Sequence, residues 1–421
     1  MRNPLASYLD EKRAWLRQSP AYRYYRRTAA RRQRRELERL VHMAMNLATD
    51  EATHARSARE LDGRKSSRKP LPETLGAANV VGVGAQGWER FGLWPSFGRS
   101  CDFHLFTDGL DVDVPFYCHS RTERDARIER LLGFIDGIER TAPVHACFIY
   151  ADASNLSADL FRRLHDRGIW TILMGLDDRH TFAPFKRGDL EAGVATVSPL
   201  VDLYWTSWRT GVLVHRSVGG RAWFGGAAAD PTFHRALPPT EETDVLFLGQ
   251  AYGARREIIG ELRDLGVNVT CRGHGWDGGF VSFEDYVRLY ATAKIVLGIS
   301  AVGAMDDVTI LKGRDFEAPM CGTCYVTQYT EELSEFFDLG SEVGCYSTPL
   351  QAAELIVTLL NDPPRREAMR KRALAASLEN NTWSVRLRQL YEVMRTPNLI
   401  GRASFRQSRG PYPTLPLDGR S

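Results

Sequence analysis

Among the charged side chains of the segment from Lys312 to Thr327, the acidic Glu317 and two basic residues have types that suit the binding of a nucleotide. Glu317 follows Lys312 and Arg314 closely along the chain. A carboxylate can accept hydrogen bonds from both hydroxyls of a ribose, and the basic side chains could bind phosphate. A surface helix with a solvated glutamate would explain the local pattern equally well, so both interpretations stay open on these residues alone.

These side chains are expected on a short helix that leads into a buried strand. The helix begins at about Arg314 and ends at Cys321-Gly322, because glycine is the usual residue at a left-handed helix stop. Residues 323–326 are β-prone, as expected of a buried parallel strand. Ligands of open α/β sheets bind near such strand and helix ends, which places Glu317 at a binding edge.

A second group of candidate residues follows the predicted strand 244–248. This strand leads into a glycine turn and then into a helix whose first turn carries two arginines. Such an arrangement can neutralise a pyrophosphate, whereas the alternative is a helix with solvent-exposed arginines. The candidate binding residues are Gly249, Tyr252, Arg255 and Arg256, together with His274 and Trp276 from a later loop that could wall a nucleobase.

Two carboxylates and a histidine follow a predicted strand in the first half of the chain. Residues 169–174 are predicted to form a buried strand, and Asp177, Asp178 and His180 come soon after it. Carboxylates at the carboxyl end of a parallel strand, with a histidine nearby, are candidates for a catalytic general base. The alternative is that the aspartates only cap a helix or loop.

Glycines near residue 82 suggest a third place where a ligand could approach the backbone. The strand predicted over 79–83 contains Gly82 and runs into Gly84, so both are further candidate binding residues. With Asp108 at the end of the next predicted strand, the pattern also matches a dinucleotide-binding fingerprint. An NAD-dependent oxidoreductase is therefore an alternative.

The composition is that of a globular protein with room for two domains. The chain has 421 residues, of which 43% are hydrophobic and 25% are charged. No apolar run approaches the roughly 20 residues of a membrane span, and the N-terminus lacks a secretory signal, so we expect a cytoplasmic protein. Cys321 and Cys324 form a CxxC pair, but no second pair lies at ligand spacing, so no metal site is expected.

The positive charge is concentrated at the start of the chain. Residues 1–70 contain 18 Lys and Arg against 8 Asp and Glu, a net charge of +10, whereas the remainder carries −7. We expect residues 1–72 to form a basic helical extension with an apolar stripe from Leu37 to Ala48 and a flexible linker over 63–72. The extension could bind an anionic membrane or nucleic acid, or pack on its own N-terminal domain.

From Asp244 to about Leu390 the chain resembles the C-terminal half of a GT-B glycosyltransferase, specifically the CgeB-like, spore-maturation branch of the group 1 transferases. The matching blocks are residues 244–276, 282–300, 313–337 and 380–394. The resemblance implies that Glu317 binds the donor ribose and that Arg255 or Arg256 meets its diphosphate. We expect Lys312 or Arg314 to close the other side of the diphosphate. The chain departs from many group 1 enzymes at Thr309, where they carry a second glutamate.

The resemblance implies an α/β protein of the GT-B fold, with two facing Rossmann-like domains. The expected divisions are the extension and linker 1–72, the acceptor-side domain 73–238, the nucleotide-sugar-binding domain 239–396 and a disordered tail 397–421. The expected activity is metal-independent transfer of a sugar from a nucleotide-sugar donor to an unidentified acceptor, without a further cofactor, in a bacterial cytoplasm or at the inner membrane face. A non-catalytic sugar- or polyanion-binding protein of the same fold is the alternative.

Overall fold

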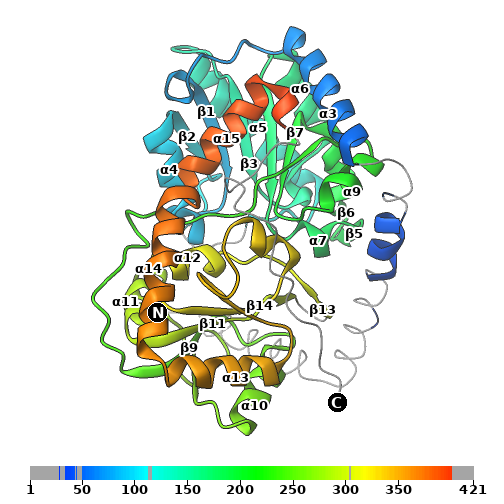
Figure 1. Cartoon of the computed structure of the whole chain (residues 1–421). Coiled ribbons are helices and arrows are strands. Elements are labelled where there is room, and N and C mark those ends of the chain that lie inside the picture. Colours follow the sequence, from blue (N-terminus) through cyan, green and yellow to red (C-terminus); the bar gives the residue numbers. More distant parts are fainter. Residues whose placement is uncertain are drawn as a thin grey trace, which may run out of the picture.

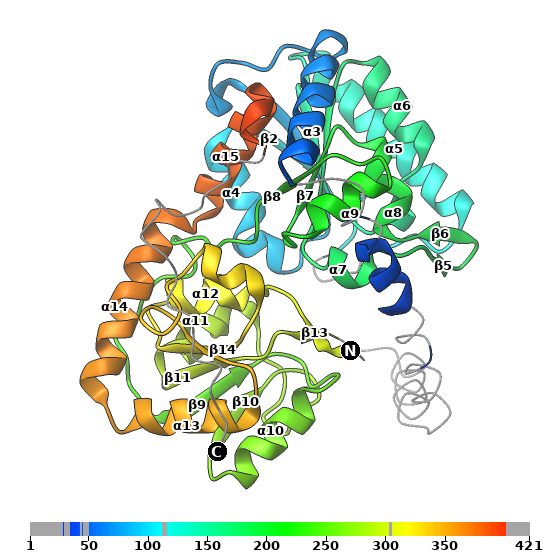
Figure 2. The ribbon, with the colours of Figure 1, turned by 45° about the vertical axis from the view of Figure 1, so that its right-hand side comes forward.

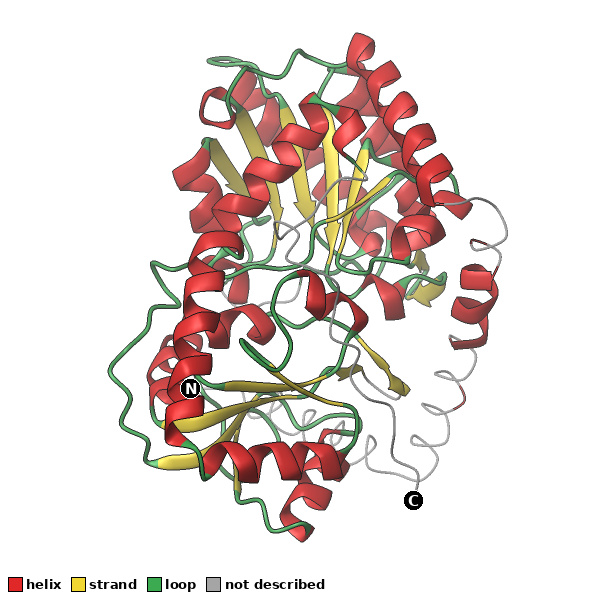
Figure 3. Cartoon of the chain, in the orientation of Figure 1, coloured by secondary structure: helices red, strands yellow, loops and turns green. Residues whose placement is uncertain are grey.

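The computed structural model describes residues 28, 34–42, 44, 50–111, 116–302 and 305–400. Within these residues the chain forms two α/β domains, one above the other in Figure 1, and each is built on a parallel sheet. Figure 3 shows the strands as the inner layer of each domain, with helices outside them. The predicted α/β class with two Rossmann-like domains is confirmed.

The N-terminal domain contains a six-stranded parallel sheet in the order β2-β1-β3-β4-β7-β8. Every residue of β1 is buried, as expected of a parallel strand that is covered on both faces. The hydroxyls of Ser120 and Ser157 accept backbone N–H groups at the starts of α5 and α6, which satisfies donors that a helix N-terminus leaves unpaired. Its elements are α3 (Asp50–Arg64), β1 (Asn79–Gly84), α4 (Leu93–Ser100), β2 (Asp102–Phe106), α5 (Arg121–Glu139), β3 (Ala146–Tyr150), α6 (Ala158–Asp166), β4 (Trp170–Gly175), α7 (Asp178–Thr181), β5 (Phe185–Arg187), β6 (Leu190–Ala192), α8 (Val194–Val197), β7 (Leu203–Thr206), α9 (Gly211–Ser217) and β8 (Ala222–Phe224).

The C-terminal domain contains a five-stranded parallel sheet in the order β10-β9-β11-β14-β15. A short antiparallel hairpin, β12–β13, follows β11 and leads toward α12. The elements are β9 (Thr243–Leu248), α10 (Arg255–Asp264), β10 (Val269–Arg272), α11 (Phe283–Ala291), β11 (Ala293–Gly298), β12 (Ala301–Val302), β13 (Met305–Thr309), α12 (Arg314–Met320), β14 (Tyr325–Gln328), β15 (Gly344–Tyr346), α13 (Pro349–Leu360), α14 (Pro363–Asn380) and α15 (Trp383–Arg395).

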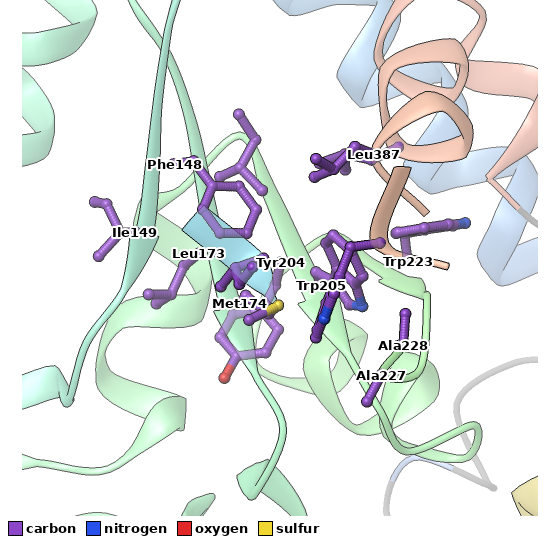
Figure 4. Close-up of a cluster of buried hydrophobic side chains, with 14 of the residues drawn as sticks. Phe148, Ile149, Leu173, Met174, Tyr204, Trp205, Trp223, Ala227, Ala228 and Leu387 are labelled. Carbon is purple, nitrogen blue, oxygen red and sulfur yellow. The ribbon is translucent and has the colours of Figure 1, made fainter. Parts of the chain in front are cut away.

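The chain returns to the N-terminal domain through α14 and α15, which run along both domains in Figures 1 and 2. Ala229 fixes the crossing, because its N–H donates to Asn381 O at 3.0 Å and its carbonyl accepts from Trp383 N at 3.1 Å. Figure 4 shows Leu387 of α15 on the aromatic core of the N-terminal domain, near Trp205. The expected C-terminal domain 239–396 therefore ends, in space, before α15.

The segment Gly63–Pro72 is docked on the N-terminal domain and is not the flexible linker that its composition predicts. Arg64 and Arg68 both donate to the buried carboxylate of Asp202, at 2.8 and 2.9 Å. Burial alone would raise the pKa of Asp202, but hydrogen bonds from His165 and Arg68 outweigh it and hold this pKa well below its usual value. Polar residues in this segment thus serve as anchors.

The described part of the extension is also packed on the N-terminal domain. Leu37, Leu40 and Ala44 from the predicted apolar stripe are buried in its core, and Glu60 of α3 forms a two-point ion pair with Arg216 at 2.7 Å. The other residues of the extension lie outside the described ranges, so an anionic partner for them stays a prediction. No helix among the described residues is long and apolar enough to cross a membrane.

The expected disordered tail starts with ordered residues. Pro397–Leu399 forms a short 3-10 helix, and Ile400 is buried against the N-terminal domain core. The remainder, residues 401–421, lies outside the described ranges. The boundary of the expected tail is therefore too early by at least four residues.

Candidate active site

The turn after β9 brings two arginine side chains against a glycine. A Cβ at Gly249 would overlap the guanidinium of Arg314 and lie 3.3 Å from Nη1 of Arg255, so a side chain at this position would displace the arginines from this arrangement. A Cβ at Gly273 would in turn overlap the Gly249 carbonyl, which accepts a hydrogen bond from Trp276 Nε1 at 2.9 Å. The predicted glycine turn is present, and it packs the loop of residue 273 against the arginines.

Arg255 and Arg314 keep several N–H groups without partners although both side chains are enclosed. Nη2 of Arg314 donates to Leu248 O at 2.5 Å, but its Nε and Nη1 are buried and have no hydrogen-bond partner among the described residues. Nη1 of Arg255 donates to Gln250 O at 3.0 Å, and its Nε is likewise buried and unpartnered. Buried donors of this kind are costly unless a ligand satisfies them.

The two guanidinium groups also repel each other. Burial and the charge of Arg314 lower the pKa of Arg255 to about 10. Both groups lie over the ring of Phe247, with guanidinium carbons 5.6 and 5.2 Å from its centroid, and the ring of Tyr252 lies 4.1 Å from Arg255. An anion between the arginines would relieve the repulsion and accept hydrogen bonds from the free N–H groups, so the arrangement is a candidate anion site.

Glu317 lies one helical turn after Arg314 on the same face of α12. Its half-buried carboxylate closely approaches Gly313, where a Cβ would lie 2.8 Å from Oε1. Burial raises the pKa of Glu317 to about 7, although the charge of Arg314 opposes this shift. No side chain among the described residues hydrogen-bonds to this carboxylate. It can therefore accept hydrogen bonds from the hydroxyl groups of a ligand bound beside the candidate anion site.

Two buried residues near Glu317 escaped the sequence reasoning. Tyr290 of α11 has a buried hydroxyl without a hydrogen-bond partner, and burial together with the charge of Glu317 raises its pKa. Asp315 accepts from Lys312 N and from Tyr325 Oη, both at 2.6 Å, and thereby fixes the start of α12. The acidic residue in the first helical turn was a signal for Asp315, whereas nothing local identifies Tyr290.

Arg256, the neighbour of Arg255, points to a different place. Its Nη2 donates to Gly275 O, and its guanidinium carbon lies 5.2 Å from the ring of Trp276. His274 is exposed on the same loop, and its carbonyl accepts from Ala251 N at 2.9 Å. The structure therefore separates the two arginines, because Arg255 belongs to the anion site and Arg256 supports the loop of residues 273–276.

The three predicted catalytic residues take different environments. Asp178 is buried, where its Oδ2 accepts from Thr206 Oγ1 and lies 3.3 Å from His215 Nε2. His180 is half-buried on the same short helix. Asp177 presents an exposed carboxylate to the C-terminal domain, with Oδ1 lying 3.5 Å from Lys312 Nζ. Asp178 is thus held away from any substrate, and Asp177 is the accessible carboxylate of the predicted pair.

Gly82 and Gly84 do not form the binding loop that their spacing suggested. Both lie inside β1, where a Cβ at Gly82 would overlap the ring of Phe103 and one at Gly84 would lie 2.6 Å from Tyr150 O. Close packing against neighbouring strands explains both glycines. Asp108, the acidic residue of the dinucleotide fingerprint, is engaged by Arg127 and Arg130, at 2.7 and 2.5 Å, which removes the basis for the NAD alternative.

The described residues contain no group of three or more His, Cys, Asp or Glu side chains that could hold a metal ion. Cys321 and Cys324 are both buried, and burial raises the pKa of each thiol, for Cys324 to about 12. Thiols with raised pKa values are poor nucleophiles and poor metal ligands. The CxxC spacing therefore reflects packing.

The architecture consists of two α/β domains, with the candidate anion site in the second, and comparison with solved structures identifies it as the GT-B fold. A glycosyltransferase from Rickettsia africae aligns with a TM-score of 0.54 at 8% identity, covering 76% of this chain and 99% of that one. Sucrose-phosphate synthase from Thermosynechococcus elongatus gives 0.51 at 12% identity, covering 76% and 98%. Anabaena HepE, in a complex with UDP-glucose, gives 0.51 at 12% identity, covering 75% and 99%.

Comparison with protein-family models gives a match within the second domain. Residues 255–392 match the family model described as glycosyl transferase-like, and this range includes Arg255, Arg314 and Glu317. No curated protein sequence matches the chain. Residues 255–392 are therefore similar to a glycosyl transferase-like family, within a chain that has the GT-B fold.

Proposed function

We propose that this protein is a glycosyltransferase that transfers a sugar from a nucleotide-sugar donor and that binds the donor mainly through its C-terminal domain. The observation that carries the proposal is the pair of enclosed arginines, Arg255 and Arg314, whose free N–H groups adjoin the unpartnered carboxylate of Glu317. A diphosphate fits between the cations, and the ribose hydroxyls fit Glu317. The UDP-glucose complex of Anabaena HepE supports this class of donor.

We assign a role in the transfer to each charged group of the arrangement. Negative charge grows on the leaving diphosphate in the transition state, and Arg255, Arg314 and Lys312 stabilise it without a bound metal. Asp177, across the domain boundary, is the candidate general base that accepts the proton of the acceptor hydroxyl. Burial of Arg255 strengthens its interaction with the diphosphate, because the local dielectric constant is low.

A panel of nucleotide sugars tests the proposal. Thermal shift reports binding, and release of the free nucleoside diphosphate, with and without EDTA, reports transfer or hydrolysis and any metal requirement. We expect at least one donor to bind and to be turned over in EDTA, and we expect Asp177→Asn to lose turnover while retaining nucleotide affinity. Binding without turnover for every acceptor would instead define a non-catalytic sugar-nucleotide-binding protein.

The N-terminal extension supplies a second part of the proposal, namely that its basic residues bring the enzyme to an anionic acceptor or surface, as a CgeB-like cytoplasmic enzyme would need. Residues 1–33 carry nine Lys and Arg against two Asp and Glu. Since α3 and Arg68 are docked, the informative truncation removes residues 1–33 and leaves the docked segment in place. Loss of salt-sensitive binding to anionic liposomes or to DNA, with nucleotide turnover retained, is the expected result.

A further inference from the structure

Three charged residues in a row, Asp177 to Arg179, lie at the start of the short helix α7, and they face in two directions. Asp178 points back into the N-terminal domain, as described above. Its neighbours on either side, Asp177 and Arg179, reach the C-terminal domain. Figures 1 and 2 show α7 at the end of the N-terminal domain that faces the C-terminal domain. The position of α7 is therefore defined by contacts on both sides of the domain boundary.

Of the two contacts with the C-terminal domain, the one that Arg179 makes is the shorter. Its Nη1 donates to the backbone carbonyl of Thr309 at 2.9 Å, and its guanidinium carbon lies 5.7 Å from the ring of Trp208. Its Nε is buried without a hydrogen-bond partner among the described residues. Arg179 is also close enough to act on the buried carboxylate of Glu332, because burial raises the pKa of Glu332 and the charge of Arg179 opposes this shift.

The carbonyl that Arg179 holds lies at the start of the loop that supplies the candidate donor site. Residues 310–313 belong to no helix or strand, and they connect β13 to the helix of Arg314 and Glu317. Within the C-terminal domain, Ile310 N donates to Ser300 O at 3.2 Å, and Asp315 holds the far end of the loop. The middle of the loop receives its additional constraint from Asp177, through Lys312.

The rear face of α7 is anchored firmly enough to transmit such a constraint. Asp178 accepts from Thr206 Oγ1 and faces His215 Nε2, and His215 Nδ1 lies 2.7 Å from Ser198 Oγ. All four side chains are buried, so the polar contacts are not in competition with bulk water. Because the end of β7, the helix α9 and the 3-10 helix that begins at Ser198 supply these groups, α7 is tied to the N-terminal domain at several points.

We propose that Arg179 is a positioning residue that couples the N-terminal domain to the donor loop 309–314. The inference rests on the proposed function, because it assigns Arg179 an effect on the site of Arg314 and Glu317 without any contact to donor. When the domains are apposed, the hydrogen bond to Thr309 and the Asp177–Lys312 contact set the loop from outside. Nucleotide binding draws mainly on the C-terminal domain, whereas transfer requires the loop in the apposed arrangement.

Three variants test the coupling with the full chain. Arg179→Ala removes the hydrogen bond, and Arg179→Lys keeps a cationic donor. Arg209→Ala is the matched control, since Arg209 also crosses the domain boundary, to Glu335 at 3.0 Å, but does not contact the donor loop. The readouts are UDP affinity by calorimetry, kcat and KM from nucleotide release, and hydrogen–deuterium exchange of the backbone amides of residues 309–316.

We expect Arg179→Ala to lower kcat by about 10- to 100-fold, the range for losing one hydrogen bond from a charged donor, while UDP affinity stays within about threefold. Amide exchange over residues 309–316 should accelerate in Arg179→Ala and not in Arg209→Ala, and Arg179→Lys should recover part of kcat. Equal losses in UDP affinity and kcat, equal effects of Arg209→Ala, or unchanged exchange would each overturn the coupling.

Failure of the proposed function has a separate signature. A parent protein that binds no nucleoside diphosphate and releases none from any nucleotide sugar contradicts that function, whatever the variants do. The exchange comparison between Arg179→Ala and Arg209→Ala is independent of activity, so it still decides whether α7 holds the loop.

Discussion

The two domains treat charged groups at their facing edges in opposite ways. In the N-terminal domain, Asp108 is held by two arginines and Asp178 by buried polar groups. In the C-terminal domain, Arg255 and Arg314 keep enclosed N–H groups free and lie close enough to repel each other. Paired charges of this kind in the first domain contribute to stability, whereas the unpaired arginines of the second domain reduce stability and suit the ligand role that we propose for them.

The largest effect that this contrast predicts is on folding, at Asp202. Asp202→Ala leaves Arg64 and Arg68 without their shared carboxylate, and we expect the free energy of unfolding to fall by about 3–5 kcal/mol, as for other broken buried ion pairs. Urea denaturation measures the loss, and Asp202→Asn serves if the alanine variant does not fold. A loss below about 1 kcal/mol would show that the docked segment contributes little.

Acid sensitivity provides a second measure at the same residue. Because the folded pKa of Asp202 lies below its unfolded value of about 3.9, its contribution to stability is present above about pH 4 and is lost as the pH falls further. Asp202→Asn should therefore flatten the acid limb of a stability–pH curve. An acid limb of unchanged steepness would assign that loss of stability to other groups.

The reverse behaviour is expected at the anion site. Arg255→Met should reduce turnover by roughly 100- to 1,000-fold, since it removes a cation that the leaving diphosphate needs. The same change should leave the unfolding free energy of the ligand-free protein unchanged or higher, because it removes one member of a repelling pair. Steady-state kinetics measure the turnover, and urea denaturation of the same sample measures the stability. A variant that is less stable than the parent but still active would contradict the contrast between the two domains.

Glu317 sharpens the comparison through pH. Two hydroxyl hydrogen bonds to a carboxylate are worth roughly 2–4 kcal/mol, so Glu317→Gln should weaken nucleotide binding by about one to three orders of magnitude. Since its pKa is about 7, affinity of the parent for a nucleotide sugar should rise with pH up to about 7 and level off above. Calorimetry across this range should show no such rise for Glu317→Gln, and a flat profile for the parent would contradict the assignment.

The smallest effect is expected at Arg256, next to Arg255 in sequence. Its guanidinium is exposed and contacts Gly275 O and Trp276, so Arg256→Ala should change turnover by less than about tenfold and stability by about 0.5 kcal/mol or less. It is also the matched control for Arg255→Met in the same assays. Equal losses at the two positions would contradict the separation that the structure makes between them.

The local sequence pattern was sufficient to predict the helices and strands around the candidate site, but not the contacts that their side chains make. The helix with its arginines and the strand before them follow from hydrophobic runs and glycine stops, and both are present in α10 and β9. The choice between Arg255 and Arg256 could not be made, because both lie in the first helical turn and only the neighbouring turns of chain distinguish their directions. The same limit applies to Gly82. Its spacing from the other glycines suits a loop, but the residue is a glycine because the ring of Phe103 leaves no room for a side chain.

Contacts between distant segments account for the remaining errors. Gly63–Pro72 has the composition of a linker, yet Arg68 finds its carboxylate 134 residues further along the chain. The contact between Arg179 and Thr309 spans 130 residues and the boundary between two domains. No periodicity or motif within either segment carries such information, so sequence reasoning found α7 by its aspartates and missed the arginine between the domains.

The return of α15 to the N-terminal domain has a consequence for how the protein is made. A ribosome completes residues 79–224, with all six strands of the first sheet, before it synthesises the C-terminal domain and then α15. Until that helix emerges, the apolar surface formed by Phe97, Phe148 and Ile172 lacks the cover that Leu387 and Met394 provide. The nascent first domain therefore carries an open hydrophobic face for the time that more than 150 further residues take to be translated, and chaperone binding to ribosome-bound chains should persist until α15 has left the exit tunnel.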